Sequence, residues 1–180
     1  KTHTIVNNES ADIVRMLNSG FGELARGSID LYPAALREEI DQLNAAIYPT
    51  LNNGVYRAGF ATTQVSYEEA VSDVFCMLDT LETRLATREF LCGGQLTEAD
   101  IRLFVTLVRF DAAYHGVFKC NRRKLAEYPH LDRYLRTMLA VPGIRETVNI
   151  DHIKQGYYSI KVLNPNGIVP QGPDLSAYGL

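Results

Sequence analysis

The residues of this sequence that could do chemistry are mainly tyrosines. Tyr56 lies in a stretch bordered by glycines, Tyr114 ends an apolar segment, and Tyr157 follows Gly156. A phenol both donates and accepts hydrogen bonds, so converging hydroxyls could stabilise a thiolate or pass a proton to an aromatic substrate. Tyrosines also fill protein cores with their hydroxyls bonded elsewhere. The sequence leaves both interpretations open.

An acidic residue and a serine, Glu9 and Ser10, stand at the predicted start of a helix. The free amides and the positive dipole end of a helix bind carboxylates, and the serine hydroxyl adds a donor. Glu9 could hold an ammonium group. The pair would suit an amino-acid-like ligand that carries both charges. The alternative interpretation is an ordinary N-cap.

Two aspartates have structural explanations. Asp100 follows Thr97 by three positions, which predicts a capping box in which each residue bonds the other's backbone amide. We therefore interpret Thr97 and Asp100 as a structural N-cap. Asp111 points away from the polar side of the same helix, so we expect it to be buried and held in an ion pair.

Composition excludes several classes of function. Three scattered cysteines, Cys76, Cys92 and Cys120, are typical of a reducing cytosol rather than a disulfide framework, and we expect a cytoplasmic protein with Cys76 buried in a helix. The histidines lack ligand spacing, which predicts no metal. A net charge of −3 argues against nucleic-acid binding. No apolar run reaches the roughly 18 residues of a membrane span.

The element that organises the chain covers residues 96–114. It opens with the capping box, and only Arg102, Thr106 and Arg109 interrupt its apolar surface. A helix that is apolar on nearly every side belongs at the centre of a protein. We expect the rest of the chain to pack around it.

Other helices are expected on both sides of this segment. One begins at Pro33, runs to residue 51 and is bent or frayed at its end by Pro49. Another begins with a capping box at Ser66 and runs to about residue 88. Two more begin at Pro129 and Pro142. Residues 52–64 show no periodicity and predict an ordered loop or a short broken helix, of the kind that often serves function.

The two ends of the chain differ from this pattern. Residues 2–6 predict a strand and residues 9–17 a helix, which suggests that residues 1–26 are the last part of a domain. Three prolines, together with Gly167 and Gly172, exclude a helix from the last 20 residues or so. The predicted fold is therefore an all-α bundle over residues 27–159, with a βα remnant before it and an extended tail, residues 160–180, behind it.

Longer motifs resemble a known family. Residues 90–101, FLCGGQLTEADI, resemble the signature of the C-terminal all-α domain of glutathione transferases, and residues 6–10 resemble the end of their thioredoxin-like domain. Five more stretches resemble the glutathionyl-hydroquinone reductases, the Xi class of these transferases: residues 52–61, 109–114, 118–121, 152–159 and 164–170. The resemblance covers essentially the whole chain.

The resemblance implies reduction of glutathionyl-hydroquinones by thiol exchange, with glutathione as co-substrate and a homodimer as the assembly. Glu9 and Ser10 match the pair that binds glutathione. Tyr56 matches a proton donor or acceptor at the hydroquinone. Tyr114 and Tyr157 match tyrosines that lower the pKa of the reactive cysteine.

The family's nucleophilic cysteine, which lies near the start of the thioredoxin-like domain, has no match here. We therefore expect the 180 residues alone to show no reductase turnover. Two other classes stay open: a conventional transferase that conjugates electrophiles, and a non-catalytic interaction module. The module predicts a large exposed apolar surface, with Tyr56, Tyr114 and Tyr157 far apart.

Overall fold

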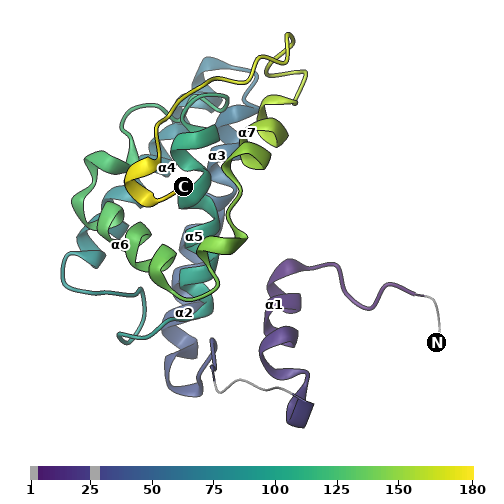
Figure 1. Ribbon diagram of the computed structural model, residues 1–180, viewed down its shortest axis with the longest axis vertical. Coiled ribbons are helices and arrows are strands. Elements are labelled where there is room, and N and C mark those ends of the chain that lie inside the picture. Colours follow the sequence, from purple (N-terminus) through teal and green to yellow (C-terminus); the bar gives the residue numbers. More distant parts are fainter. Residues whose placement is uncertain (1–3, 25–28) are drawn as a thin grey trace.

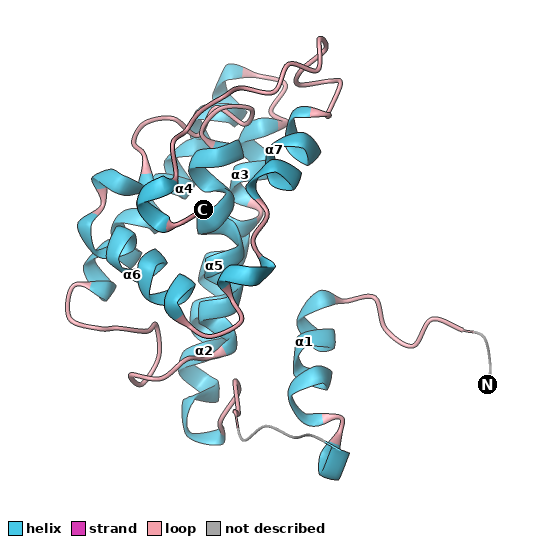
Figure 2. Cartoon of the chain, viewed as in Figure 1, coloured by secondary structure: helices cyan, strands magenta, loops and turns pink. Residues whose placement is uncertain are grey.

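The computed structural model describes residues 4–24 and 29–180, which form a helical bundle with one further helix beside it (Figures 1 and 2). The seven α-helices of this part are α1 (Ser10–Ser19), α2 (Arg37–Ile47), α3 (Gly54–Gly59), α4 (Gln64–Leu85), α5 (Glu98–Arg109), α6 (Pro129–Ala140) and α7 (Ile150–Tyr158).

The predicted βα remnant lacks its strand. Residues 1–3 lie outside the described part, and residues 4–6 form no strand. Ile5 and Val6 are 82% and 91% exposed, and no described segment offers these residues an edge with which to form a ladder. A strand needs such a partner for its backbone groups. The helical half of the prediction corresponds to α1.

Helix α5 lies in the middle of the bundle and contacts α2 and α6 (Figure 1). Its start is fixed by Asp100, whose Oδ2 accepts hydrogen bonds from the Thr97 amide and the Thr97 hydroxyl, both at 2.9 Å. Leu103 and Leu107 on α5 are fully buried. Burial raises the pKa of Asp100, although these donors favour its charged form.

The segment between α2 and α4 is more helical than predicted. Pro49 lies in a π-helical turn, Tyr48–Asn52, that continues α2, and α3 occupies the stretch expected to be a loop or a broken helix. Helix α4 begins earlier than predicted: Thr63, not Ser66, is its cap and accepts a bond from the Ser66 amide at 3.1 Å.

The last part of the chain departs from the prediction at one helix start. Helix α6 begins at Pro129 as predicted, but the helix expected from Pro142 begins at Ile150. Its cap is Asn149, whose Oδ1 accepts a bond from the His152 amide at 2.9 Å. Beyond α7, the tail runs back along the bundle and contains one short 3₁₀ turn, Ser176–Tyr178 (Figure 1).

Two residue environments differ from expectation. Cys76 is exposed, because it lies on the outer side of α4 while Phe75 and Leu78 face the core. Asp111 forms no ion pair with any described residue. Its carboxylate instead accepts a hydrogen bond from the Leu125 amide at 3.1 Å, and burial raises its pKa.

No helix in the described part of the chain combines the length and the apolar character that a membrane crossing requires.

Candidate functional site

Three phenol hydroxyls meet at one point of the structure. The hydroxyl of Tyr157 lies 2.6 Å from that of Tyr56 and 2.8 Å from that of Tyr114. The three side chains come from α7, α3 and the turn that follows α5. Three hydroxyls carry three protons, and two hydrogen bonds among them use two. The third proton is left to be donated to a ligand.

Phe118 holds the three rings in place. Its ring stacks on Tyr114 with centroids 5.4 Å apart and lies 5.1 Å from Tyr56 and 5.6 Å from Tyr157. A Cβ atom at Gly59 would overlap the Phe118 ring, so only glycine lets α3 approach this closely. The glycine that borders the Tyr56 stretch therefore has a packing role at the site.

Burial keeps the inner phenols protonated. It raises the pKa of Tyr114, which is 3% exposed, and raises that of Tyr157 to about 12. A neutral phenol can donate a hydrogen bond to an anion and so favour that anion's charged form. Tyr56 is 38% exposed and lies at the outer end of the chain of hydroxyls.

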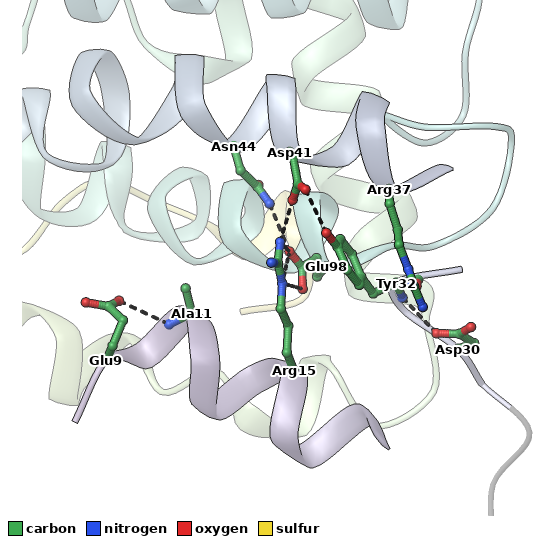
Figure 3. Close-up of polar contacts among 9 residues, drawn as sticks. All are labelled: Glu9, Ala11, Arg15, Asp30, Tyr32, Arg37, Asp41, Asn44 and Glu98. Atoms are coloured by element: carbon green, nitrogen blue, oxygen red, sulfur yellow. Dashed lines mark hydrogen bonds and ion pairs between the residues drawn. The ribbon is translucent and has the colours of Figure 1, made fainter. Parts of the chain in front are cut away.

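These phenols line a pocket of about 370 Å³. Its walls are formed by Ser10, Tyr48, Asn52, Tyr56, Arg102, Val105, Thr106, Arg109, Tyr114 and Tyr157. Ser10 comes from α1, so this helix reaches the pocket. Glu9 does not line it, and its carboxylate accepts a hydrogen bond from the Ala11 amide at 3.2 Å as the N-cap of α1 (Figure 3).

The polar side of α5 forms one wall of the pocket, which the sequence did not predict. Val105, expected in the core, is 42% exposed and lines the pocket, whereas Thr106 is 4% exposed. The reason is Asn52, whose side-chain amide donates to the Thr106 hydroxyl at 2.7 Å and to the Arg102 carbonyl at 3.0 Å. These two bonds join the turn after α2 to α5.

An ion-pair cluster holds α1 against the bundle (Figure 3). The Nη2 atom of Arg15 lies 2.7 Å from Glu98 and 2.6 Å from Asp41. Glu98 is 2% exposed and also accepts a bond from Asn44 at 3.0 Å. These bonds raise the pKa of Arg15, chiefly through Glu98. Because α1 buries none of its own residues, Ser10 is positioned by this cluster together with the hydrogen bonds of Asn18 to Asp30 and the Leu31 amide.

Two features of the site had no sequence signal that we used. Both wide π-turns, Tyr48–Asn52 and Phe110–Tyr114, supply pocket residues, and such turns often occur at functional sites. Glu98 stands in the first turn of α5, where an acid ordinarily complements the helix dipole. Because the start of α5 is buried, the Glu98 carboxylate needs a positively charged partner from another element, and that partner is Arg15.

None of the three cysteines lines the pocket. Burial raises the pKa of Cys92 to about 11 and that of Cys120 to about 12. Across the described residues, no group of three or more histidine, cysteine, aspartate or glutamate side chains is arranged to hold a metal ion.

Comparisons with known proteins agree with this architecture. Residues 64–137 match the family described as Glutathione S-transferase, C-terminal domain. The chain is 54% identical over 177 residues to the glutathionyl-hydroquinone reductase PcpF of Sphingobium chlorophenolicum, covering 98% of this chain and 56% of PcpF. It is 53% identical over 174 residues to the glutathionyl-hydroquinone reductase YqjG of Escherichia coli K12, covering 96% of this chain and 53% of YqjG.

Solved structures give the same result. The glutathione-bound structure of YqjG superposes with a TM-score of 0.93 at 53% identity, over 96% of this chain and 56% of that one. Glutathione transferase Xi of Phanerochaete chrysosporium also gives 0.93, at 50% identity, over 96% of this chain and 57% of that one. The chain spans about half the length of these relatives. It has the all-helical fold of a glutathione transferase C-terminal domain and is a homologue of the glutathionyl-hydroquinone reductases, the Xi class of that family.

Proposed function

We propose that this chain supplies the hydroquinone pocket of an enzyme that reduces glutathionyl-hydroquinones by thiol exchange. The observation that carries the proposal is the chain of three bonded phenols, Tyr56, Tyr157 and Tyr114, in a pocket that extends to Ser10. An aromatic diol fits the phenol end. The serine at the start of α1 suits a carboxylate of the glutathione moiety.

The reaction begins with a cysteine thiolate that attacks the glutathione sulfur of the substrate. A sulfur–sulfur bond forms while the bond from sulfur to the ring carbon breaks, and its electron pair goes to the ring, which takes up one proton. The products are a hydroquinone and a mixed disulfide. A glutathione thiolate then attacks the mixed disulfide, releases the cysteine thiolate and leaves oxidised glutathione.

The phenols have two roles in this scheme. Tyr114 and Tyr157 stay protonated, and the one proton that the chain of hydrogen bonds leaves free is donated to the attacking thiolate, which lowers the pKa of that thiol. Tyr56, at the more exposed end, exchanges the proton with the hydroquinone oxygen. The thiolate itself comes from sequence beyond these 180 residues, because Cys92 and Cys120 are buried with raised pKa values and Cys76 lies outside the pocket.

The experiment compares this chain with the polypeptide extended to the length of its relatives. We expect the extended protein to release hydroquinone from a glutathionyl-hydroquinone with consumption of one glutathione thiol and formation of one oxidised glutathione per turnover, and the 180 residues alone to release none. Turnover by the isolated chain would refute the proposal. So would an extended protein that conjugates glutathione to 1-chloro-2,4-dinitrobenzene and leaves the hydroquinone conjugate intact, which is the behaviour of a conventional transferase.

The interaction-module alternative required the three tyrosines to lie far apart. The Tyr157 hydroxyl instead lies 2.6 Å from that of Tyr56 and 2.8 Å from that of Tyr114, which favours the enzyme.

A further inference from the structure

The charged residues that line the pocket are all positive. Its lining residues include two arginines, Arg102 and Arg109, and no aspartate or glutamate. Neither arginine forms an ion pair with a described residue, whereas six other arginines of the described chain do. An unneutralised guanidinium at a pocket favours a ligand with negative charge.

Arg109 is the arginine at the phenol end. Burial raises the pKa of Tyr157, and the nearby positive charge of Arg109 acts in the opposite direction. One guanidinium nitrogen, Nη1, donates to the Val105 carbonyl at 2.5 Å. A guanidinium has five N–H donors in a planar fork, so this bond fixes its orientation and leaves further donors for a ligand.

The pocket continues past Arg109. Val105 and Arg109 also line a second cavity of about 210 Å³. The rest of its wall is mixed: Phe104, Val108, Val148 and Ile153 are apolar, and Thr147, Asn149 and His152 are polar. A ring bound among the phenols can therefore direct a short carbon arm past the exposed Val105 side chain, with a carboxylate at its end bonded to Arg109.

We infer that Arg109 makes this pocket selective for hydroquinones that carry an anionic substituent on a short apolar arm. The inference rests on the proposed function and names its substrate class. Arg102 lies seven residues earlier on α5, which is two turns or about 10.5 Å along the axis. It is therefore a matched pocket arginine that lies two turns away from Arg109.

The test measures binding of 2,5-dihydroxyphenylacetate and its methyl ester to this chain by ligand-observed NMR. The two probes are similar in size and differ in charge. Neither contains glutathione, so the carboxylate can come only from the quinol. We expect the acid to bind about tenfold more tightly than the ester, as for a charge-assisted hydrogen-bonded pair.

Substitutions then identify the arginine that binds the negatively charged carboxylate of the ligand. Arg109→Gln should bring the ratio of the two affinities close to one by weakening the acid more than the ester, whereas Arg102→Gln should keep the ratio. Arg109→Lys retains the charge without the planar fork and should lower the ratio about threefold. Circular dichroism melting curves establish that each variant is folded, and Arg109→Lys carries the test if Arg109→Gln is not.

Three results would overturn the inference: equal binding of acid and ester by the unaltered chain, a preference that survives in Arg109→Gln, or a preference lost in Arg102→Gln. Because no sulfur chemistry enters this measurement, a missing acid preference and a missing reductase turnover are separate results.

Discussion

At the scale of single residues, Tyr157 is the centre of the site because its hydroxyl bonds both of the others. Removing that hydroxyl interrupts the chain and leaves the ring packing intact. We predict that Tyr157→Phe lowers kcat for a glutathionyl-hydroquinone by about 10²-fold in the extended protein, as for the loss of a positioned proton donor. Steady-state kinetics of hydroquinone release measures the effect.

The matched control is Tyr67→Phe. The Tyr67 hydroxyl donates to the Lys119 carbonyl at 2.7 Å and does not line the pocket. Its removal should change kcat by less than about twofold, as for most changes away from a site. Equal effects of the two substitutions would mean that the phenols of the pocket have no special part in the reaction.

At the scale of elements, the strongest start signals were interpreted correctly and the ambiguous ones were not. Thr97 with Asp100, and Pro129, each offered one consistent helix start. For α4, Thr63 and Ser66 both had the chemistry of a cap, and the sequence could not decide between them. For α7, Pro142 competed with Asn149, where the helix is in fact capped.

The pocket itself was predictable only in part. The three phenols could be named from the sequence, because their motifs are specific. The exposure of Val105 could not, since it depends on Asn52 bonding Thr106 from another element. The two π-turns depend on bonds between residues five apart, such as the one from the His115 amide to the Phe110 carbonyl, and no residue pattern that we used encodes them.

The start of α4 gives a direct stability test. Thr63→Ala should lower the free energy of unfolding by about 1 kcal/mol, because an N-terminal amide of the helix loses its acceptor. Ser66→Ala should cost less than about half of that, since Ser66 lies inside the first turn and its hydroxyl is exposed. Urea unfolding of both variants measures the difference. The reverse order would place the cap at Ser66.

The tail is pinned to α6 by a pH-sensitive bond. The Tyr178 hydroxyl donates to Asp132 at 2.6 Å. Partial burial raises the pKa of Asp132, but bonds from Arg136 and Tyr178 outweigh it and the net pKa is lowered. A lowered carboxyl pKa contributes stability above the ordinary value of about 3.9, and that stability is lost as the pH falls through the folded-state value.

We therefore predict a pH-dependent difference between this chain and Asp132→Asn. At pH 7 the variant should be less stable by about 1–2 kcal/mol, as expected for losing hydrogen bonds to a charged group. The difference should shrink once the pH falls below about 3.9. Urea unfolding across this range, with Tyr178→Phe as the second member of a double-mutant cycle, measures it. A difference that is constant with pH would show that Asp132 acts through packing alone.

At the scale of the whole molecule, the pocket depends on a helix that is held from outside the core. Helix α1 buries none of its residues. Leu17, within the helix, is 60% exposed, and Phe21, just beyond its end, is 54% exposed. The attachment of α1 includes the Arg15 guanidinium, which stacks on the Tyr32 ring at 3.9 Å and bonds the buried Glu98 through two nitrogens (Figure 3). Asn18 adds a bond to Asp30 at 2.9 Å and accepts one from the Leu31 amide at 2.8 Å. The completeness of the pocket at Ser10 therefore depends on a few polar contacts, among them the ion pairs of Arg15 with Glu98 and Asp41.

Arg15→Met tests this dependence. The change leaves Glu98 buried with Asn44 as a donor but without its cation. Because the Arg15 side chain is 36% exposed, the cost should lie below the value of about 3–5 kcal/mol for a fully buried pair. Because α1 can leave the bundle more cheaply than the bundle can unfold, we expect most of the effect as detachment of α1. Backbone amides of α1 should then lose protection from hydrogen exchange, and those of α5 should keep it.

Double replacement of Arg15 and Glu98 by Met and Gln is the control. It should restore the stability of the bundle but not the protection of α1, since the buried charge is gone while the attachment is still missing. Protection of α1 that persists in Arg15→Met would mean that other contacts position Ser10.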